Sequence, residues 1–114
     1  MRFRSRTEGV DPGADPVLAR FRKAIDAAYG DRVERVVLFG SRARGDHRAD
    51  SDYDVAVFLK DWRSVWDELE GTSEAALDIL VDTGRVISPK PFPSAARSEA
   101  SAFMQEVRRD GREF

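Results

Sequence analysis

Residues 39–59 read FGSRARGDHRADSDYDVAVFL, and this stretch decides the fold. It begins where an apolar run, 33–39, meets glycine, which is typical of a β-strand that ends in a tight turn. It ends in a second run, 53–59, rich in β-branched and aromatic residues, which predicts a second strand. Glycine, serine and charged residues at 40–52 predict a loop with room for one helical turn. Strands joined by such a loop can pair antiparallel or parallel, so the pairing stays open.

The sequence before this stretch predicts one helix that faces the core. Asp15 and Pro16 are a typical start, because the carboxylate caps the first turn and proline fits the first helical position. Gly30 is typical of a helix end. An apolar stripe is expected to face the core: Leu18, Phe21, Ile25 and Ala28. Residues 1–14 are basic and then turn-rich, so we expect a flexible N-terminal arm followed by a single domain over 15–114.

The sequence after the stretch predicts two helices and a strand. A helical pattern extends from Asp61 to Gly84, and Gly71 is a place where it could kink or divide. One side of it is expected to face the core or to anchor a partner: Trp62, Val65, Trp66, Leu69, Ala76, Leu77 and Leu80. A short strand at 85–88 is expected to stop at three prolines: Pro89, Pro91 and Pro93. The tail 101–114 predicts an amphipathic helix with three residues inside: Phe103, Met104 and Val107.

The order of these elements predicts the fold class. Helix, strand, loop, strand, helix, strand and helix follow one another within 114 residues. We therefore expect an α/β (α+β) fold with a small mixed β-sheet and helices packed on it.

Composition narrows the possible functions. The net charge is −2 and 35% of residues are charged, so the surface does not indicate a nucleic-acid partner. There is no cysteine and only one histidine, His47, so a metal would be held by oxygen atoms, which favours Mg²⁺ or Mn²⁺. No apolar run reaches the length of a membrane span and no secretory leader is recognisable, so we expect no membrane partner and a cytoplasmic location.

Polar residues at both ends of the loop predict a metal–nucleotide site. Asp52 and Asp54 would project from one face of the strand start, where two ionised carboxylates repel each other unless a cation lies between them. Gly40 and Ser41 follow the first strand, where backbone N–H groups and a hydroxyl can hold phosphate oxygens. Arg44 adds positive charge nearby. The sequence contains no G-x-x-x-x-G-K-[ST] run, so this is not a P-loop.

GSRARG followed by SDYDVAVFL resembles the signature of the polymerase-beta superfamily of nucleotidyltransferases. The short chain and the later TGRVISPKPF are most similar to the minimal nucleotidyltransferases of bacteria and archaea. The resemblance implies the polymerase-beta-like fold and transfer of a nucleoside monophosphate to a hydroxyl. It implies that Gly40 and Ser41 hold the triphosphate of ATP, and that the catalytic Asp52 and Asp54 hold Mg²⁺. The family uses two ions, and one ion is the alternative here. Arg44 either contacts a phosphate or is a surface ion-pair partner.

One feature departs from the family. Its active members usually carry a third carboxylate on the next strand, where this chain has Ile87 and Ser88. Other acids fit an exposed surface better: Asp78, Asp82 and Glu99. Arg42 and Arg48 are expected to be solvated, and His47 has no assigned role. Ser51 is expected to cap the turn before the aspartates.

The resemblance leads to three hypotheses of function. Minimal nucleotidyltransferases are often encoded beside a HEPN-domain protein, which implies an antitoxin that transfers AMP from ATP to a hydroxyl, commonly of tyrosine, on a HEPN ribonuclease toxin. The alternative is a catalytically weak or inactive module that neutralises its partner by direct binding. Adenylylation of a small molecule, such as an antibiotic, ranks third, because enzymes of that kind carry more chain for the acceptor.

Overall fold

In the computed structural model, residues 11–114 are described. The helices and strands, in chain order, are η1 Pro12–Ala14, α2 Pro16–Tyr29, η2 Gly30–Arg32, β1 Val33–Phe39, α3 Gly40–Arg44, β2 Tyr53–Leu59, α4 Val65–Thr83, β3 Ile87–Pro93, η3 Ser94–Ser98, α5 Ala102–Asp110 and β4 Arg112–Glu113. The first ten residues of the predicted arm lie outside the described residues, and its end forms η1, in which Pro12 is buried. Within 11–114, no helix has the length and apolar character needed to cross a membrane.

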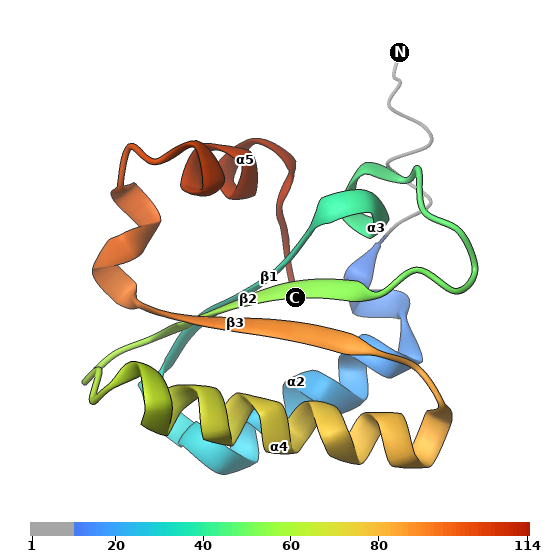
Figure 1. The fold of residues 1–114 in the computed structure, drawn as a ribbon, viewed down its shortest axis with the longest axis horizontal. Coiled ribbons are helices and arrows are strands. Elements are labelled where there is room, and N and C mark those ends of the chain that lie inside the picture. The colour runs from blue at the N-terminus through green and yellow to red at the C-terminus, as the bar shows by residue number, and fades with distance from the viewer. Residues whose placement is uncertain (1–10) are drawn as a thin grey trace.

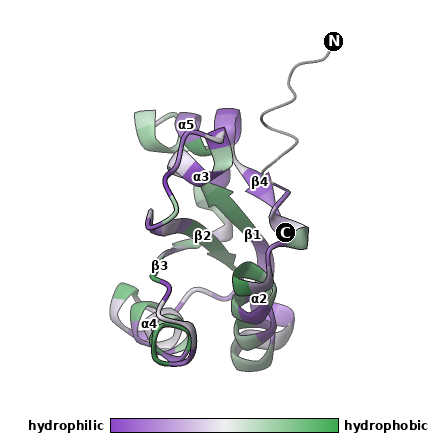
Figure 2. Ribbon diagram, turned by 90° about the vertical axis from the view of Figure 1, so that its right-hand side faces the viewer, coloured by the Kyte–Doolittle hydropathy of each residue, from purple (hydrophilic) through white to green (hydrophobic). Residues whose placement is uncertain are grey.

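The four strands form one mixed sheet in the order β3-β2-β1-β4. β1 pairs antiparallel with β2 and with β4, whereas β3 pairs parallel with β2. The α2 and α4 helices cover one face of the sheet, and α3 and α5 lie on the other (Figure 1). Figure 2 shows the strongly hydrophobic β1 and β2 between these two layers of helices. The predicted mixed sheet with packed helices is confirmed, and the open question of pairing is settled as antiparallel.

Alternation along β2 divides the core into two clusters. Tyr53, Val55, Val57 and Leu59 belong to the cluster under α2 and α4. Ala56 and Phe58 belong to the cluster that includes Met104 and Val107 of α5. Because successive strand residues point to opposite faces, Asp54 lies on the α5 face with Ala56 and Phe58. The fold thus places the Asp54 carboxylate on the face of the sheet where α3 and α5 lie (Figure 1).

The first and last helices follow their local signals. The Asp15 carboxylate accepts a hydrogen bond of 2.8 Å from the Val17 backbone N–H, and Gly30 ends α2 with a φ of +55°. Three of the four residues of the predicted stripe are buried, but Ala28 is exposed, and at this end of α2 its neighbour Tyr29 packs on the core instead. In α5, Met104 and Val107 are buried as predicted and Phe103 is partly buried.

The third strand is longer than predicted. It spans Ile87–Pro93 and so includes the three prolines that were expected to end it. The prolines alternate along β3, which is an edge strand, so their missing N–H groups can all face away from β2. Proline therefore limits further pairing at this edge instead of ending the strand. The short β4 was not predicted.

The buried side of α4 also differs from the prediction. The core-facing residues are Glu68, Thr72, Ala75, Ala76 and Ile79. Of the predicted stripe, Trp62 and Ala76 pack on the core, whereas five residues are exposed: Val65, Trp66, Leu69, Leu77 and Leu80. Glu68 can be buried because its carboxylate pairs with the Arg32 guanidinium and accepts a 3.1 Å hydrogen bond from the Arg63 backbone N–H.

Gly71 neither kinks nor divides α4, which is continuous from Val65 to Thr83. The Tyr29 hydroxyl of α2 donates a 3.0 Å hydrogen bond to the backbone oxygen of Glu68. A Cβ atom at position 71 would lie 2.1 Å from the Tyr29 oxygen. Gly71 is therefore required by the close approach of α2 to α4.

This packing reverses the usual effect of a glycine-to-alanine change in a helix. Alanine normally stabilises a helix interior by about 0.5–1 kcal/mol relative to glycine. We expect Gly71→Ala to lower the free energy of unfolding instead, by about 1–3 kcal/mol, because Tyr29 must move. Urea unfolding followed by circular dichroism measures the change.

The matched control is the same substitution without the tyrosine. In a Tyr29→Ala background the obstructing ring is gone, so Gly71→Ala is expected to stabilise the protein. An equal destabilisation in both backgrounds would contradict this role of Gly71.

Candidate active site

The site is built around a close contact between Gly40 and Asp54. Phe39, the last residue of β1, is paired with Asp54 of β2. Gly40 follows with a φ of +74°, and a Cβ atom there would lie 2.5 Å from Asp54 Oδ2. Glycine is therefore needed both for the backbone conformation and for the space. The contact brings the Gly-Ser half of the motif against the Asp-Tyr-Asp half.

The two predicted carboxylates differ in environment. Asp52 is exposed just before β2, and Asp54 is half-buried near the strand start. Burial raises the pKa of Asp54; Lys90 opposes this increase, and the negative charges of Asp52 and Glu106 add to it. The surroundings of Asp54 thus disfavour its charged form, and a bound cation would relieve this cost.

The donor set suits a hard divalent cation. Carboxylate oxygens are typical ligands of Mg²⁺, which usually takes one or two of them and completes its shell with water and substrate phosphate. Over residues 11–114, no group of three or more histidine, cysteine or acidic side chains is arranged to hold a metal ion. Asp52 and Asp54 therefore fit one Mg²⁺ that shares its coordination with a phosphate-bearing substrate.

The position of the missing third carboxylate holds a hydroxyl and an ammonium group. Ser88 is paired with Asp54 in the parallel register of β2 and β3, while Ile87 points into the other core cluster. Lys90 lies two residues further along the same face, with Nζ 3.5 Å from Ser88 Oγ. Sequence reasoning missed Lys90, because the strand was expected to stop before it.

Ser41 follows Gly40 in the first turn of α3, next to the contact between Gly40 and Asp54. Ser41 is half-buried in the first turn, and the residue before α3, Phe39, offers no side-chain cap. The first N–H groups of a helix have no partner within the helix, so they are free to donate hydrogen bonds to an anionic ligand. This is the arrangement that the phosphate-holding role of Gly40 and Ser41 needs.

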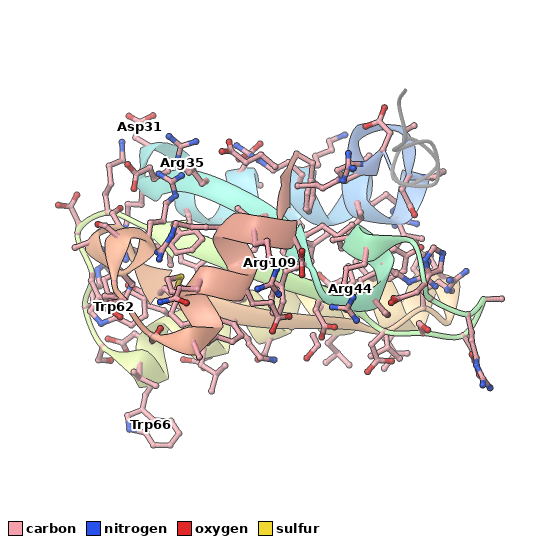
Figure 3. All side chains as sticks on the ribbon, turned by 90° about the horizontal axis from the view of Figure 1, so that it is seen from above. Asp31, Arg35, Arg44, Trp62, Trp66 and Arg109 are labelled. Carbon is pink, nitrogen blue, oxygen red and sulfur yellow. The ribbon has the colours of Figure 1, made fainter. Side chains whose placement is uncertain are left out.

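Arg44 lies at the other end of α3 and is exposed. Its Nε atom is 3.3 Å from an Asp46 carboxylate oxygen, and its Nη1 atom is 3.8 Å from Glu106 of α5. Figure 3 shows Arg44 and Arg109 on these two adjacent helices. The contacts are those of a surface ion pair, and exposed pairs exchange readily with other anions. A phosphate contact by Arg44 stays a prediction.

Arg42 was expected to be solvated, and this prediction is wrong. Its side chain is buried under the loop that precedes β2. Nε donates a 2.9 Å hydrogen bond to the Ser51 backbone oxygen, and Nη2 donates one of 3.1 Å to the Ala49 backbone oxygen. The guanidinium carbon lies 3.9 Å from the Tyr53 ring centroid. Arg42 therefore fixes the loop that presents Asp52.

The same loop contains the expected turn cap, because Ser51 Oγ accepts a hydrogen bond of 2.9 Å from the Arg48 backbone N–H.

A cavity of about 590 Å³ opens beside the site. It is lined by residues of α3, α5, β4 and the chain before α2, including Arg44, Arg109 and Arg112. Asp52 and Asp54 are not part of its lining. The cavity shares Arg44 with the site and offers space for a further part of a bound molecule.

The Gly40–Asp54 contact predicts an unusually large cost for a small substitution. Gly40→Ala combines backbone strain with a steric clash, so we expect the free energy of unfolding to fall by about 3 kcal/mol. Gly84→Ala is the matched control, because Gly84 has the same φ of +74° with no atom within 4 Å. The control is expected to lose only about 1–2 kcal/mol. Equal losses in urea unfolding would show that the Asp54 contact is unimportant.

The raised pKa of Asp54 predicts a pH-dependent gain in stability on its removal. A carboxyl group whose pKa is higher in the folded than in the unfolded state favours folding while protonated, and this contribution is lost as pH rises through the folded pKa. We therefore expect Asp54→Asn to raise the melting temperature at pH 7, with a smaller gain at pH 4. Asp52→Asn, a change of an exposed neighbour, is the control and is expected to have a smaller effect. A lower melting temperature for Asp54→Asn at pH 7 would contradict the argument.

Several known proteins are similar to this chain. The family model for the nucleotidyltransferase domain matches residues 18–107. The "Putative protein adenylyltransferase MJ0141" of Methanocaldococcus jannaschii is 42% identical over 45 residues, which are 40% of this chain and 46% of the relative. The "Putative protein adenylyltransferase MJ0604" of the same organism is 35% identical over 43 residues, or 38% of this chain and 43% of the relative. The matches thus span less than half the length of these curated relatives.

Solved structures share the fold at low sequence identity. A "putative nucleotidyltransferase from Sulfolobus solfataricus" has a TM-score of 0.65 and 18% identity, and the match covers 96% of this chain and 86% of that one. A "toxin-antitoxin with AMP-PNP" has a TM-score of 0.60 and 20% identity, with 83% of this chain and 69% of that one covered. Because the family model spans the Gly-Ser turn, both aspartates and the whole of β1, β2 and β3, this chain belongs to the nucleotidyltransferase domain family.

Proposed function

We propose that this chain transfers AMP from Mg²⁺-bound ATP to a hydroxyl group of a partner protein, and that it thereby acts as the antitoxin of a HEPN ribonuclease toxin. The observation that carries the transferase part is the contact of Gly40 with the Asp54 carboxylate. It sets a phosphate-binding turn against a metal-binding pair, which is what a metal–nucleotide substrate requires. Use of ATP is consistent with a cytoplasmic location.

Each residue has a defined part in the proposal. The backbone N–H groups of Gly40 and Ser41, with the Ser41 hydroxyl, bind the triphosphate. Asp52 and Asp54 are the proposed catalytic ligands of Mg²⁺, which supplies charge neutralisation at the phosphates when bound. Arg44 exchanges its surface ion pairs for a phosphate oxygen, and Lys90 adds positive charge on the same face. These groups position the substrate and stabilise charge, which is most of what phosphoryl chemistry needs.

The proposed transfer is a single displacement at phosphorus. The acceptor oxygen forms a bond to the α-phosphorus while the bond from that phosphorus to the bridging oxygen breaks. Pyrophosphate leaves with the electron pair of the broken bond, and the proton of the acceptor hydroxyl passes to solvent. The product is a phosphodiester between AMP and the partner protein.

The choice of a protein acceptor and a toxin partner rests on analogy. Both curated relatives carry the name of protein adenylyltransferases, and a toxin–antitoxin structure with AMP-PNP has the same fold. The described residues form a single four-stranded sheet with its helices, and a macromolecular acceptor would complete the site. This analogy supports a protein as the acceptor of AMP, without identifying the protein.

A second function is favoured by the two residues of β3 that lie beside Asp54 on the same face of the sheet. Ser88 and Lys90 stand where a third carboxylate would help to activate the acceptor. A chain with this substitution could bind ATP and Mg²⁺ yet transfer AMP slowly, and neutralise its partner by stoichiometric contact. This is the binding-module alternative, and it differs from the first in needing no turnover.

Labelling with α-³²P-ATP distinguishes the two functions. The purified chain is mixed with Mg²⁺, labelled ATP and the product of the neighbouring gene, and label on protein is measured by gel autoradiography. We expect label on the partner, and a loss of about 100-fold or more in Asp52→Asn, because the metal-binding pair is broken. Glu34→Gln, an exposed carboxylate change outside the candidate site, is the matched control and is expected to leave labelling unchanged.

The remaining outcomes identify the alternatives. An unlabelled partner that forms a stable complex, with neutralisation intact in Asp52→Asn, would establish the binding module. Labelled aminoglycoside in a parallel screen would move the small-molecule hypothesis to first place. Absence of a HEPN-domain protein next to this gene would remove the antitoxin assignment and leave the transferase proposal to stand on the site.

A further inference from the structure

The α4 helix exposes an apolar stripe that the fold does not use. Its side chains are largely solvent-accessible, with 78% exposure at Trp66, 56% at Leu77 and 80% at Val81. Figure 3 shows Trp66 pointing away from the body of the protein. Leu69 and Leu80 belong to the same side of the helix by their spacing. An apolar surface of this extent on a small domain is typical of a binding surface.

This stripe continues into a groove at the edge of the sheet. Leu77 and Leu80 of α4 face Val86 and Pro89, and together they line a cavity of about 240 Å³. We call the stripe and this cavity the α4–β3 groove, defined by Trp66, Leu69, Leu77, Leu80, Val86 and Pro89. The groove has room for apolar side chains that another molecule inserts.

On α4, the charge beside the groove is of one sign. Acidic residues occupy the neighbouring side of α4: Asp67, Glu70, Glu74, Asp78 and Asp82. Residues 65–83 contain no lysine or arginine. Asp82 pairs with Arg20 of α2, whereas Glu70, Glu74 and Asp78 lie next to the apolar stripe by helical spacing. A complementary surface would therefore be apolar at its centre and basic at its border.

Two other occupants fit less well. A second copy of this chain, packed α4 on α4, would bring two acidic rows together, which is unfavourable. An added β-strand would need N–H groups along β3, but every second residue from Pro89 to Pro93 is proline. A helix of another protein therefore fits the groove better than either of these.

We infer that the α4–β3 groove docks a partner protein through a helix that is apolar on one side and flanked by lysine or arginine. The inference rests on the proposed function in that the partner is the AMP acceptor. β3 lies between the groove and the face with Ser88 and Lys90, so a partner held at this edge lies next to the candidate active site without covering Asp54. Docking and chemistry are thus carried by separate residues.

A pair of substitutions in the groove tests the inference. The purified product of the neighbouring gene is titrated into the chain, and the dissociation constant is measured by calorimetry. We expect Leu77→Ser with Leu80→Ser to weaken binding at least 10-fold, because the apolar contact is lost. Ala27→Ser with Ala28→Ser, on the exposed side of α2, is the matched control and is expected to have no effect. Thermal melting establishes that both variants are folded.

Charge reversal gives a second test that leaves the apolar contact intact. Glu74→Lys with Asp78→Lys is expected to weaken binding at least 5-fold and to reduce its salt dependence, because the border of the partner is basic. Glu34→Lys, on β1, is the control for a charge change elsewhere and is expected to bind as the unmodified chain does.

The outcomes separate this inference from the proposed function. Label on the partner with unchanged affinity in both groove variants would overturn the groove and leave the transfer of AMP in place. A groove-dependent complex without label would support the groove and overturn the transfer. A dimer of this chain in light scattering, lost in the leucine variant, would replace the partner with a second copy. Absence of any complex and of any label would overturn both.

Discussion

The close approach of Gly40 to the Asp54 carboxylate is the constraint on which the rest of the site depends. It requires the antiparallel register that pairs Phe39 with Asp54, and it requires a residue without a Cβ atom at the turn. The same turn starts α3 and so sets Ser41 and its N–H groups beside the carboxylate. The Gly-Ser and Asp-Tyr-Asp halves of the motif are therefore two sides of one contact between neighbouring strands.

The site is an arrangement that a fold without a function would avoid. Burial and the nearby acids raise the pKa of Asp54 and so disfavour its charged form, and Lys90 opposes only part of this effect. Arg42 is buried to hold the loop, although a charged side chain in that place is expensive unless its hydrogen bonds are satisfied. Local instability of this kind is common where a protein keeps a binding site ready for a charged ligand.

Local sequence signals predicted much of the fold, and long-range partners account for what they missed. Asp15 and Gly30 mark a helix whose ends depend only on neighbouring residues, and the strand of Tyr53–Leu59 carries its own apolar pattern. The burial of Glu68 depends on Arg32, which is 36 residues away and leaves no trace in the periodicity of α4. Arg42 was missed for the same reason, because its partners are backbone oxygens of a loop without a regular pattern.

The large apolar residues on the exposed side of α4 and the small residues on its buried side have a common cause. Gly71, Thr72, Ala75 and Ala76 are small enough for the helix to lie close to Tyr29 and the sheet, and a domain of this size has little core for more bulk. The larger residues of α4 therefore face outward. Solubility favours polar residues at such positions, and the acidic row supplies them only on one side. The apolar stripe lies between the acidic residues of α4 and the proline-rich edge strand β3, and it serves neither the core nor the solubility of the monomer. A partner protein that covers the stripe is therefore its simplest explanation.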